Sequence, residues 1–218
     1  MSAHFKSVVL DVDSTLSGIE GIDWLAALRG EDQLRRIASL TQEAMEGGLP
    51  LEQIYGKRLS AVRPRRDEID ALGRAYVAEV AMGASHVIRE LHNNAVQVVL
   101  VSGGIRSAIV PLAMDVGVAL EDLHAVRVRF DALGAYAGYD AASPLTTSTG
   151  KRDVVAGLSL PRPILAVGDG STDVAMRDVV DTFGAFTGFA RRPAVVEVAD
   201  VVITSFPELL RIVLTGLN

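Results

Sequence analysis

Two aspartates that directly follow a short apolar run constrain this chain more than any other feature. Residues 8–10 (Val-Val-Leu) are typical of a buried strand, and Asp11 and Asp13 come directly after them. Because residues two apart in a strand point to the same face, the two carboxylates start close together at its carboxyl end. Acids crowded there repel unless a divalent cation lies between them or one holds a proton. Aspartate is also common where a strand turns into a loop, so this stretch alone leaves both a turn and a metal site open.

Composition limits the class of protein. With 218 residues and 49% hydrophobic content, the chain can bury a sizeable core, as one domain with an insertion or as two domains. The formal net charge of −6 argues against nucleic acid or an anionic membrane as the main partner. The absence of cysteine excludes disulfides, thiolate metal sites and thiol catalysis. No apolar run suits a signal peptide or a membrane span, so we expect a soluble, cytoplasmic protein.

The hydrophobic pattern predicts one strand, a helical insertion, and then alternating strands and helices. Residues 17–75 show apolar positions at helical spacing with charged residues between them. After this insertion, strands are predicted at residues 96–101, 163–167, 182–186 and 200–203, a β-hairpin at 125–130 and 135–139, and helices at 86–92, 107–116, 151–158 and 207–214. Repeated strand–helix units predict an α/β fold: a doubly wound, mostly parallel sheet formed by residues 1–16 and 76–218.

Three of the predicted strands end in polar or glycine-rich sequence, and ligands bind at the carboxyl ends of strands in such sheets. The three ends are Asp11-Val12-Asp13, Ser102-Gly103-Gly104 and Gly168-Asp169-Gly170. Carboxylates suit a hard cation such as magnesium, and a hydroxyl with two backbone N–H groups can hold the oxygens of an anion. Lys151, near the start of a predicted helix, adds a cation that can balance phosphate charge. Together these groups predict phosphoryl transfer, with one carboxylate as nucleophile and a neighbour as acid and base.

Each of these motifs by itself has a simpler interpretation. A Ser-Gly-Gly or Gly-Asp-Gly segment is most often a loop or turn, and a single lysine is usually a solvated surface residue. Gly150-Lys151 also suggests a phosphate-binding loop, but that motif requires glycine at position 145 and Ser or Thr at 152, where this chain has Leu and Arg. No G-x-G-x-x-G segment follows a strand, so a dinucleotide site lacks support. The joint occurrence of the motifs at separate strand ends favours the phosphoryl-transfer interpretation.

The same residues resemble the haloacid dehalogenase superfamily, and within it the phosphoserine phosphatase family. The four superfamily motifs occur in order as Asp11-Val12-Asp13-Ser14-Thr15, Ser102, Lys151 and Gly168-Asp169-Gly170-Ser171-Thr172-Asp173. Further segments similar to the phosphatase family are Glu20-Gly21-Ile22-Asp23, Ala44-Met45-Glu46-Gly47, Lys57-Arg58-Leu59-Ser60 and Ala137-Gly138-Tyr139-Asp140. The resemblance covers nearly the whole chain and implies a Rossmann-like catalytic core with a small helical-bundle cap, residues 17–75, that sets substrate specificity.

The resemblance implies roles for the core residues. Asp11 would be the nucleophile that forms an aspartyl-phosphate, and Asp13 the general acid and base. Mg²⁺ would be held by Asp11, the main-chain carbonyl of Asp13, and Asp169. The residues implied to bind phosphate or to line its site are Ser102, Gly103, Lys151 and Thr172, where many bacterial members have Asn. The residues implied to support the metal site are Thr15 and Asp173.

The resemblance also implies how the substrate is chosen. In the cap, Glu20 would bind the ammonium group of O-phospho-L-serine and Arg58 its carboxylate, while Arg192 matches a further active-site arginine of some members. As alternatives, Glu20 could be a helix N-terminal acid and Arg58 an exposed cation. The expected reaction is hydrolysis to L-serine and phosphate, the last step of serine biosynthesis, by a monomer or homodimer whose partner is a small phosphorylated amino acid.

Two other functions remain open on the sequence. The same chemistry could act on another small phosphorylated metabolite, or transfer the phosphoryl group to an alcohol such as homoserine. A non-catalytic phospho-accepting receiver module also combines clustered acids, a hydroxyl and a lysine. Receivers place the lysine last, however, whereas here Asp169 follows Lys151.

Overall fold

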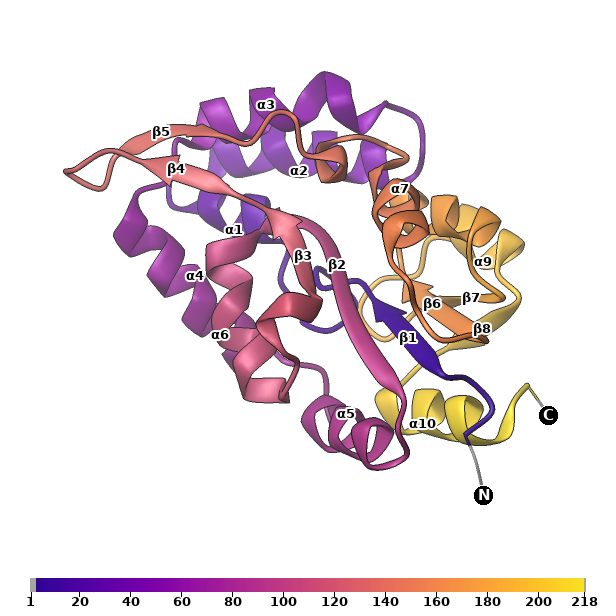
Figure 1. Ribbon diagram of the computed structural model, residues 1–218. Helices are drawn as coiled ribbons and strands as arrows, with labels where there is room; N and C mark the ends of the chain where they lie inside the picture. Colours follow the sequence, from indigo (N-terminus) through magenta and orange to yellow (C-terminus); the bar gives the residue numbers. More distant parts are fainter. Residues whose placement is uncertain (1–2, 218) are drawn as a thin grey trace.

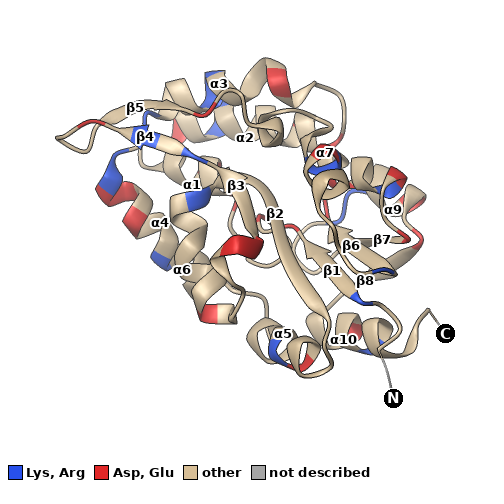
Figure 2. Ribbon diagram, viewed as in Figure 1, with Lys and Arg blue, Asp and Glu red and all other residues tan. Residues whose placement is uncertain are grey.

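The computed structural model describes residues 3–217, and its centre is a six-stranded, all-parallel sheet of order β3-β2-β1-β6-β7-β8 (Figure 1). The strands of this sheet are β1 (Ser7–Leu10), β2 (Gln97–Ile105), β3 (Leu123–Val126), β6 (Ile164–Gly168), β7 (Thr182–Phe186) and β8 (Val201–Ile203). None of these strands contains a charged side chain, and they are drawn in tan in Figure 2. The predicted α/β fold with a parallel sheet is therefore confirmed.

Ten α-helices lie in the described part of the chain. The first four, which form the insertion after β1, are α1 (Gly21–Ala27), α2 (Glu31–Met45), α3 (Leu51–Val62) and α4 (Arg66–Ala78). The other six are α5 (Ala84–Asn93), α6 (Arg106–Val116), α7 (Gly150–Gly157), α8 (Ser171–Val174), α9 (Pro193–Val198) and α10 (Phe206–Thr215). Among residues 3–217, no helix has the length and apolar character that crossing a membrane requires.

The register of the central strands brings three strand ends to one edge. All four residues of β1 are buried, and Leu10 lies opposite Leu100 of β2 and Val167 of β6. Asp11 therefore follows at the level where β6 ends, at Gly168, and where the regular pairing of β2 with β3 stops, at Val101. Because all three strands run parallel, the groups that follow them gather at the same edge of the sheet.

Two of the predicted strand boundaries are wrong. Strand β2 does not stop at Ser102 but continues to Ile105, with its pairing to β3 interrupted between Val101 and Ile105. The backbone stays extended through the two glycines but leaves the regular ladder there. The predicted strand at residues 125–130 is divided, because β3 joins the main sheet while β4 (Val128–Phe130) pairs with β5 (Tyr136–Tyr139) in the hairpin. Apolar alternation continued through both strands and hid the change of partner.

The helical insertion leaves and re-enters the sheet layer at one place. The Gly18 N–H donates to the Glu79 carbonyl at 3.0 Å, and the Ala81 N–H donates to the Leu16 carbonyl at 2.9 Å. Helix α4 continues to Ala78 before this return. The two connecting segments are thus hydrogen-bonded to each other at the base of the insertion.

The β4–β5 hairpin lies along the insertion rather than against the sheet (Figure 1). The Arg66 N–H at the start of α4 donates to the Gly134 carbonyl at the hairpin turn, over 2.9 Å. The Arg66 guanidinium also lies over the Phe130 ring, 5.1 Å from its centre. At Gly56 of α3, a Cβ would lie only 2.6 Å from the Tyr139 Oη, so this glycine lets the hairpin approach the helix closely.

Gly150 provides a test of how tightly the start of α7 is packed. A Cβ at this position would lie 1.8 Å from the Pro144 carbonyl oxygen, which is backbone and cannot turn aside. We expect Gly150→Ala to lower the free energy of unfolding by about 2–4 kcal/mol in urea denaturation. Gly157→Ala, at the end of the same helix with nothing within 4 Å of its Cβ, should leave it unchanged or raise it by up to about 1 kcal/mol. Equal effects of the two substitutions would contradict this account of the packing.

Candidate active site

Lys151 joins two buried carboxylates at the carboxyl edge of the sheet. Its Nζ lies 2.7 Å from Oδ1 of Asp11, which follows β1, and 2.7 Å from Oδ1 of Asp173 in α8. Burial alone would lower the pKa of Lys151, but the two carboxylates outweigh it and hold this pKa above its usual value. Lys151 therefore stays charged and partly compensates the acids around it.

The Asp11 carboxyl lies in an unusual electrostatic environment. Burial and the nearby charge of Asp173 raise its pKa well above the ordinary value, while Lys151 acts in the opposite direction. Pairing with a permanent cation thus opposes the cost of burying the carboxylate. Strong pKa perturbation of this kind in a cavity is typical of functional groups.

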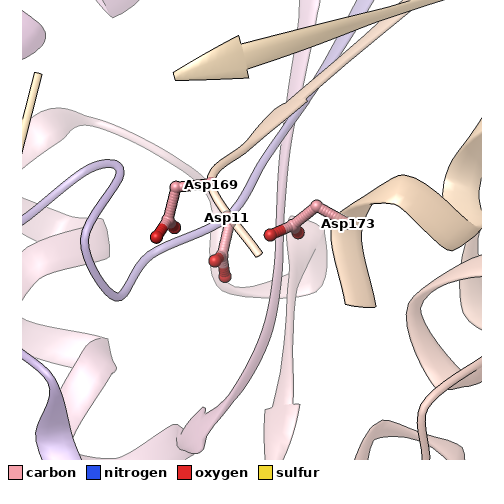
Figure 3. A group of neighbouring side chains, drawn as sticks. All are labelled: Asp11, Asp169 and Asp173. Carbon is pink, nitrogen blue, oxygen red and sulfur yellow. The ribbon is translucent and has the colours of Figure 1, made fainter. Parts of the chain in front are cut away.

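Three carboxylates could hold a metal ion. Asp11, Asp169 and Asp173 each offer an oxygen within 4.8 Å of the others, and Figure 3 shows the side chains gathering from three separate segments. The Asp169 Oδ1 accepts a hydrogen bond from Thr15 at 3.1 Å. The Asp169 Oδ2 is buried and has no hydrogen-bond partner among the described residues, although the Arg192 guanidinium lies against it as an ion pair.

The Asp173 carboxylate is already used on both oxygens. Oδ1 accepts from Lys151, and Oδ2 accepts from the Gly170 N–H at 3.0 Å. At Gly168, a Cβ would lie 2.1 Å from the Asp173 Cγ, so the end of β6 can approach this carboxylate only with glycine there. These contacts make Asp173 a support for Lys151, whereas the ion pair of Asp11 with Lys151 uses only its Oδ1.

The segment after the regular part of β2 brings a buried hydroxyl and two glycines to the cavity. The buried Ser102 Oγ accepts the Gly104 N–H at 2.8 Å, which fixes the side chain beside the two glycines. The Tyr55 hydroxyl of α3 donates to the Gly103 carbonyl at 2.7 Å. Because the Gly104 N–H is already donated to Ser102, the Gly103 N–H and the Ser102 hydroxyl remain as donors of this segment.

Asp13 is held by two hydrogen bonds from the helical insertion. Its Oδ1 accepts from the Tyr76 hydroxyl at 2.6 Å, and its Oδ2 accepts from the Gly21 N–H at 3.1 Å. Burial raises the pKa of Asp13, while these two hydrogen bonds favour the charged form. The carboxyl group is therefore fixed in orientation and remains able to gain or lose a proton.

Glu20 lies at the entry to α1, on the insertion side of the site. Its Oε1 accepts the Ser14 hydroxyl at 2.7 Å and lies 3.5 Å from Nη2 of Arg192. Burial and the neighbouring Asp13 charge raise the pKa of Glu20 to about 7. The group can therefore change its charge near neutral pH.

Arg58 lies opposite, on α3, in a buried position. Its Nη2 donates to the Thr41 hydroxyl oxygen at 2.6 Å and to Oδ1 of Asp23 at 3.2 Å. Its Nε is buried without a hydrogen-bond partner among residues 3–217. One edge of the guanidinium is thus held by the protein, and another donor is left for a ligand.

These groups enclose a cavity of about 50 Å³ between the sheet edge and helices α1–α3. The residues singled out from sequence that line it are Asp11, Asp13, Glu20, Arg58, Ser102, Gly103, Lys151, Asp169 and Thr172. The three that lie behind the lining and contact it are Thr15, Asp173 and Arg192. Charged side chains thus lie at both ends of the cavity, where they could pair with opposite charges on an elongated ligand.

Sequence reasoning missed four side chains of the site. Tyr55 and Tyr76 bond to Gly103 and Asp13, while Thr41 and Asp23 hold Arg58. Helical spacing could have found Tyr55, because it lies three residues before Arg58 on the same face of α3. Tyr76 reaches Asp13 from 63 residues away in sequence, and no local pattern indicates that contact.

Comparison with known proteins gives a consistent result. No protein-family model matches the chain. The phosphoserine phosphatase of Rattus norvegicus is 34% identical over 207 residues, covering 94% of this chain and 91% of the relative. A phospho-aspartyl intermediate analogue of phosphoserine phosphatase superimposes with a TM-score of 0.81 at 26% identity, covering 96% of this chain and 99% of that one. A substrate-bound phosphoserine phosphatase complex gives a TM-score of 0.79 at 27% identity, covering 96% and 98%.

Proposed function

Since the chain belongs to the phosphoserine phosphatase family of the haloacid dehalogenase superfamily, we propose that it hydrolyses O-phospho-L-serine to L-serine and phosphate. The observation that carries this proposal is the Asp11 carboxylate, buried at a sheet edge 2.7 Å from Lys151 and facing a cavity. A carboxylate in that setting can attack phosphorus, because the lysine balances the charge of the incoming phosphate. The serine released is a product of amino-acid biosynthesis.

Asp11 and Asp13 divide the chemistry between them. An Asp11 oxygen forms a bond to phosphorus as the bond to the serine oxygen breaks, and Asp13 supplies the proton that the serine oxygen needs. Asp13 then takes a proton from water as that water attacks the aspartyl-phosphate and restores Asp11. Ser102, the Gly103 N–H and Lys151 hold the phosphate oxygens, with Thr172 beside them.

The donor set fits Mg²⁺. Asp11, Asp169 and the main-chain carbonyl of Asp13 would hold the ion, and the cation that pairs with the Asp169 Oδ2 in this structure is the Arg192 guanidinium. Bound there, Mg²⁺ supplies positive charge that neutralises the phosphate oxygens during transfer. Thr15 orients Asp169 from the other oxygen.

Opposite charges on the insertion would select the amino-acid part of the substrate. Glu20 would bind the ammonium group, and Arg58 would bind the carboxylate through donors that include its unpaired Nε. Arg192, paired with both Glu20 and Asp169, would bridge the metal end and the ammonium end of the site. A zwitterion with a phosphate thus finds a partner for each of its charges.

We assign residues 17–75 as the cap over this site. Contacts hold it closed: the Ser171 hydroxyl donates to the Ala44 carbonyl at 2.7 Å, and the Leu51 N–H donates to Ser148 Oγ at 2.9 Å. These contacts lie beside the cavity of about 50 Å³ that the catalytic edge and the insertion line together. The cap would move away for substrate to enter and product to leave.

Asp11→Asn tests the nucleophile. The amide cannot form the aspartyl-phosphate, so we expect phosphoserine turnover to fall by at least about 10³-fold. Phosphate release is measured in the presence of Mg²⁺, and circular dichroism checks that the fold is retained. Acid quench of the wild-type reaction followed by mass spectrometry should find the phosphoryl group on Asp11. Substantial activity in a folded Asp11→Asn variant would remove Asp11 from this role.

Arg58→Ala tests the carboxylate partner. Loss of a charge-assisted hydrogen bond should lower kcat/KM for phosphoserine by about 10- to 100-fold. Turnover of p-nitrophenyl phosphate, which has no carboxylate, should change much less. Lys57→Ala, which removes the exposed cation next in sequence, is the matched control and should change neither substrate. Equal losses for both substrates in Arg58→Ala would contradict the assignment.

Glu20 predicts a pH dependence specific to the amino-acid substrate. Its pKa of about 7, raised by burial and by the Asp13 and Asp23 charges against the effect of Arg192, means that it is anionic above pH 7 and neutral below. As pH falls below 7, kcat/KM for phosphoserine relative to p-nitrophenyl phosphate should fall by up to about tenfold per unit. The ratio cancels the titration of enzyme groups that act equally on both substrates. In Glu20→Gln the ratio should be low and independent of pH; an unchanged slope would assign the titration to another group.

A further inference from the structure

A tyrosine hydroxyl contacts Asp13 and sets its orientation. No local sequence pattern predicts this contact, and the reaction steps described above do not use the tyrosine. Tyr76 is fully buried in α4, and its hydroxyl donates to Asp13 Oδ1 over 2.6 Å. The other oxygen, Oδ2, accepts the Gly21 N–H. With one donor on each oxygen, the carboxyl plane is fixed, and each oxygen keeps a second lone pair for a proton.

Tyr76 is itself held firmly against the sheet layer. Its carbonyl accepts the Ser17 hydroxyl at 3.1 Å, at the place where the insertion begins. One turn earlier on α4, a Cβ at Gly73 would lie 3.0 Å from the Pro111 ring of α6, so the two helices are in close contact. The tyrosine hydroxyl therefore occupies a fixed position relative to the catalytic edge.

The surroundings of the hydroxyl are shaped to receive it. A Cβ at Gly21 would lie 2.2 Å from the Tyr76 Oη, so the hydroxyl reaches Asp13 only because this position has no side chain. Burial and the Asp13 charge raise the pKa of Tyr76 well above its usual value, which keeps the phenol protonated and a donor. The glycine in α1 and the tyrosine in α4 are thus both needed for this hydrogen bond.

We propose that Tyr76 is a positioning residue for the general acid and base: its hydroxyl aims the Asp13 carboxyl at the serine oxygen and then at the attacking water. The inference rests on the proposed phosphatase function. In the first step an Asp11 oxygen forms a bond to phosphorus as the bond between phosphorus and the serine oxygen breaks; the electron pair of the broken bond stays on the serine oxygen, which takes the Asp13 proton. In the second step water gives its proton to Asp13 and its oxygen to phosphorus, and the electron pair of the Asp11–phosphorus bond returns to Asp11. Tyr76 keeps its own proton in both steps.

Comparing substrates with different leaving groups distinguishes a positioning role of Tyr76 from a purely structural one. A serine alkoxide is a poor leaving group and needs the Asp13 proton, whereas nitrophenolate leaves without one. Misaligned Asp13 should therefore slow both steps with phosphoserine but only the second step with p-nitrophenyl phosphate. A merely loosened site would slow both steps with both substrates.

Tyr76→Phe removes the hydroxyl and keeps the ring. For phosphoserine we expect kcat to fall by about tenfold or more with KM within about twofold of wild type. With p-nitrophenyl phosphate, stopped-flow should show nitrophenol released at the wild-type rate in the first turnover, followed by a slower steady state. Tyr55→Phe removes a buried hydroxyl that contacts Gly103 instead, and its phosphoserine-to-nitrophenyl phosphate ratio of first-turnover rates should match wild type.

Gly21→Ala gives a second variant that keeps the tyrosine. Its methyl group displaces the Tyr76 hydroxyl, so it should reproduce the kinetic pattern of Tyr76→Phe. The double variant should be no worse than either single variant, since the same hydrogen bond is lost once. Additive losses would contradict a shared mechanism.

Wild-type kinetics distinguish a failure of the proposed phosphatase function from a failure of the proposed role of Tyr76. Wild-type protein that does not hydrolyse phosphoserine would overturn the proposed function. Wild-type protein that does, together with Tyr76→Phe and Gly21→Ala variants that lose the first-turnover rate equally for both substrates, or lose no activity, would overturn the role of Tyr76 alone.

Discussion

The structure depends on one arrangement of charge, in which Lys151 lies between the buried carboxylates of Asp11 and Asp173. Isolated charges are costly to bury, so acids at the sheet edge require a cation and directed hydrogen bonds. Backbone geometry is adapted to this need: Gly168 lets Asp173 approach the end of β6, and Gly150 lets α7 start against the Pro144 backbone. Asp11, the proposed nucleophile, is thus buried beside a single cation that it shares with Asp173.

The segment that leaves β1 carries the residues proposed for both the chemistry and the selection of substrate. Asp11 ends β1, Asp13 follows in the loop, and Glu20 lies nine residues after Asp11 (20 − 11) at the entry to α1. Hydrogen bonds from Tyr76 and Gly21 tie Asp13 to the helical insertion. The proposed general acid and base is therefore oriented by the part of the chain that would surround the substrate, and this contact would link substrate recognition to catalysis.

Much of this arrangement could be predicted from sequence, because strand ends and helix spacing are local signals. The parallel sheet and the gathering of the Asp11, Ser102 and Asp169 segments at one edge followed from buried runs that end in polar residues. The split between β3 and β4 could not be predicted, since alternation of apolar residues does not name a partner strand. Contacts such as Tyr76 with Asp13 join distant segments and depend on how α4 packs, which no local pattern encodes.

The most direct test of the central claim is phosphate release from a panel of small phosphorylated metabolites with Mg²⁺. The panel contains phosphoserine, phosphohomoserine, phosphothreonine, phosphoethanolamine, glycerol phosphate and p-nitrophenyl phosphate. Charges placed at both ends of the cavity predict that phosphoserine has the highest kcat/KM, by about tenfold or more over compounds that lack its carboxylate or its ammonium group. Equal rates across the panel, or a preference for glycerol phosphate, would contradict the account that Glu20 and Arg58 select the substrate.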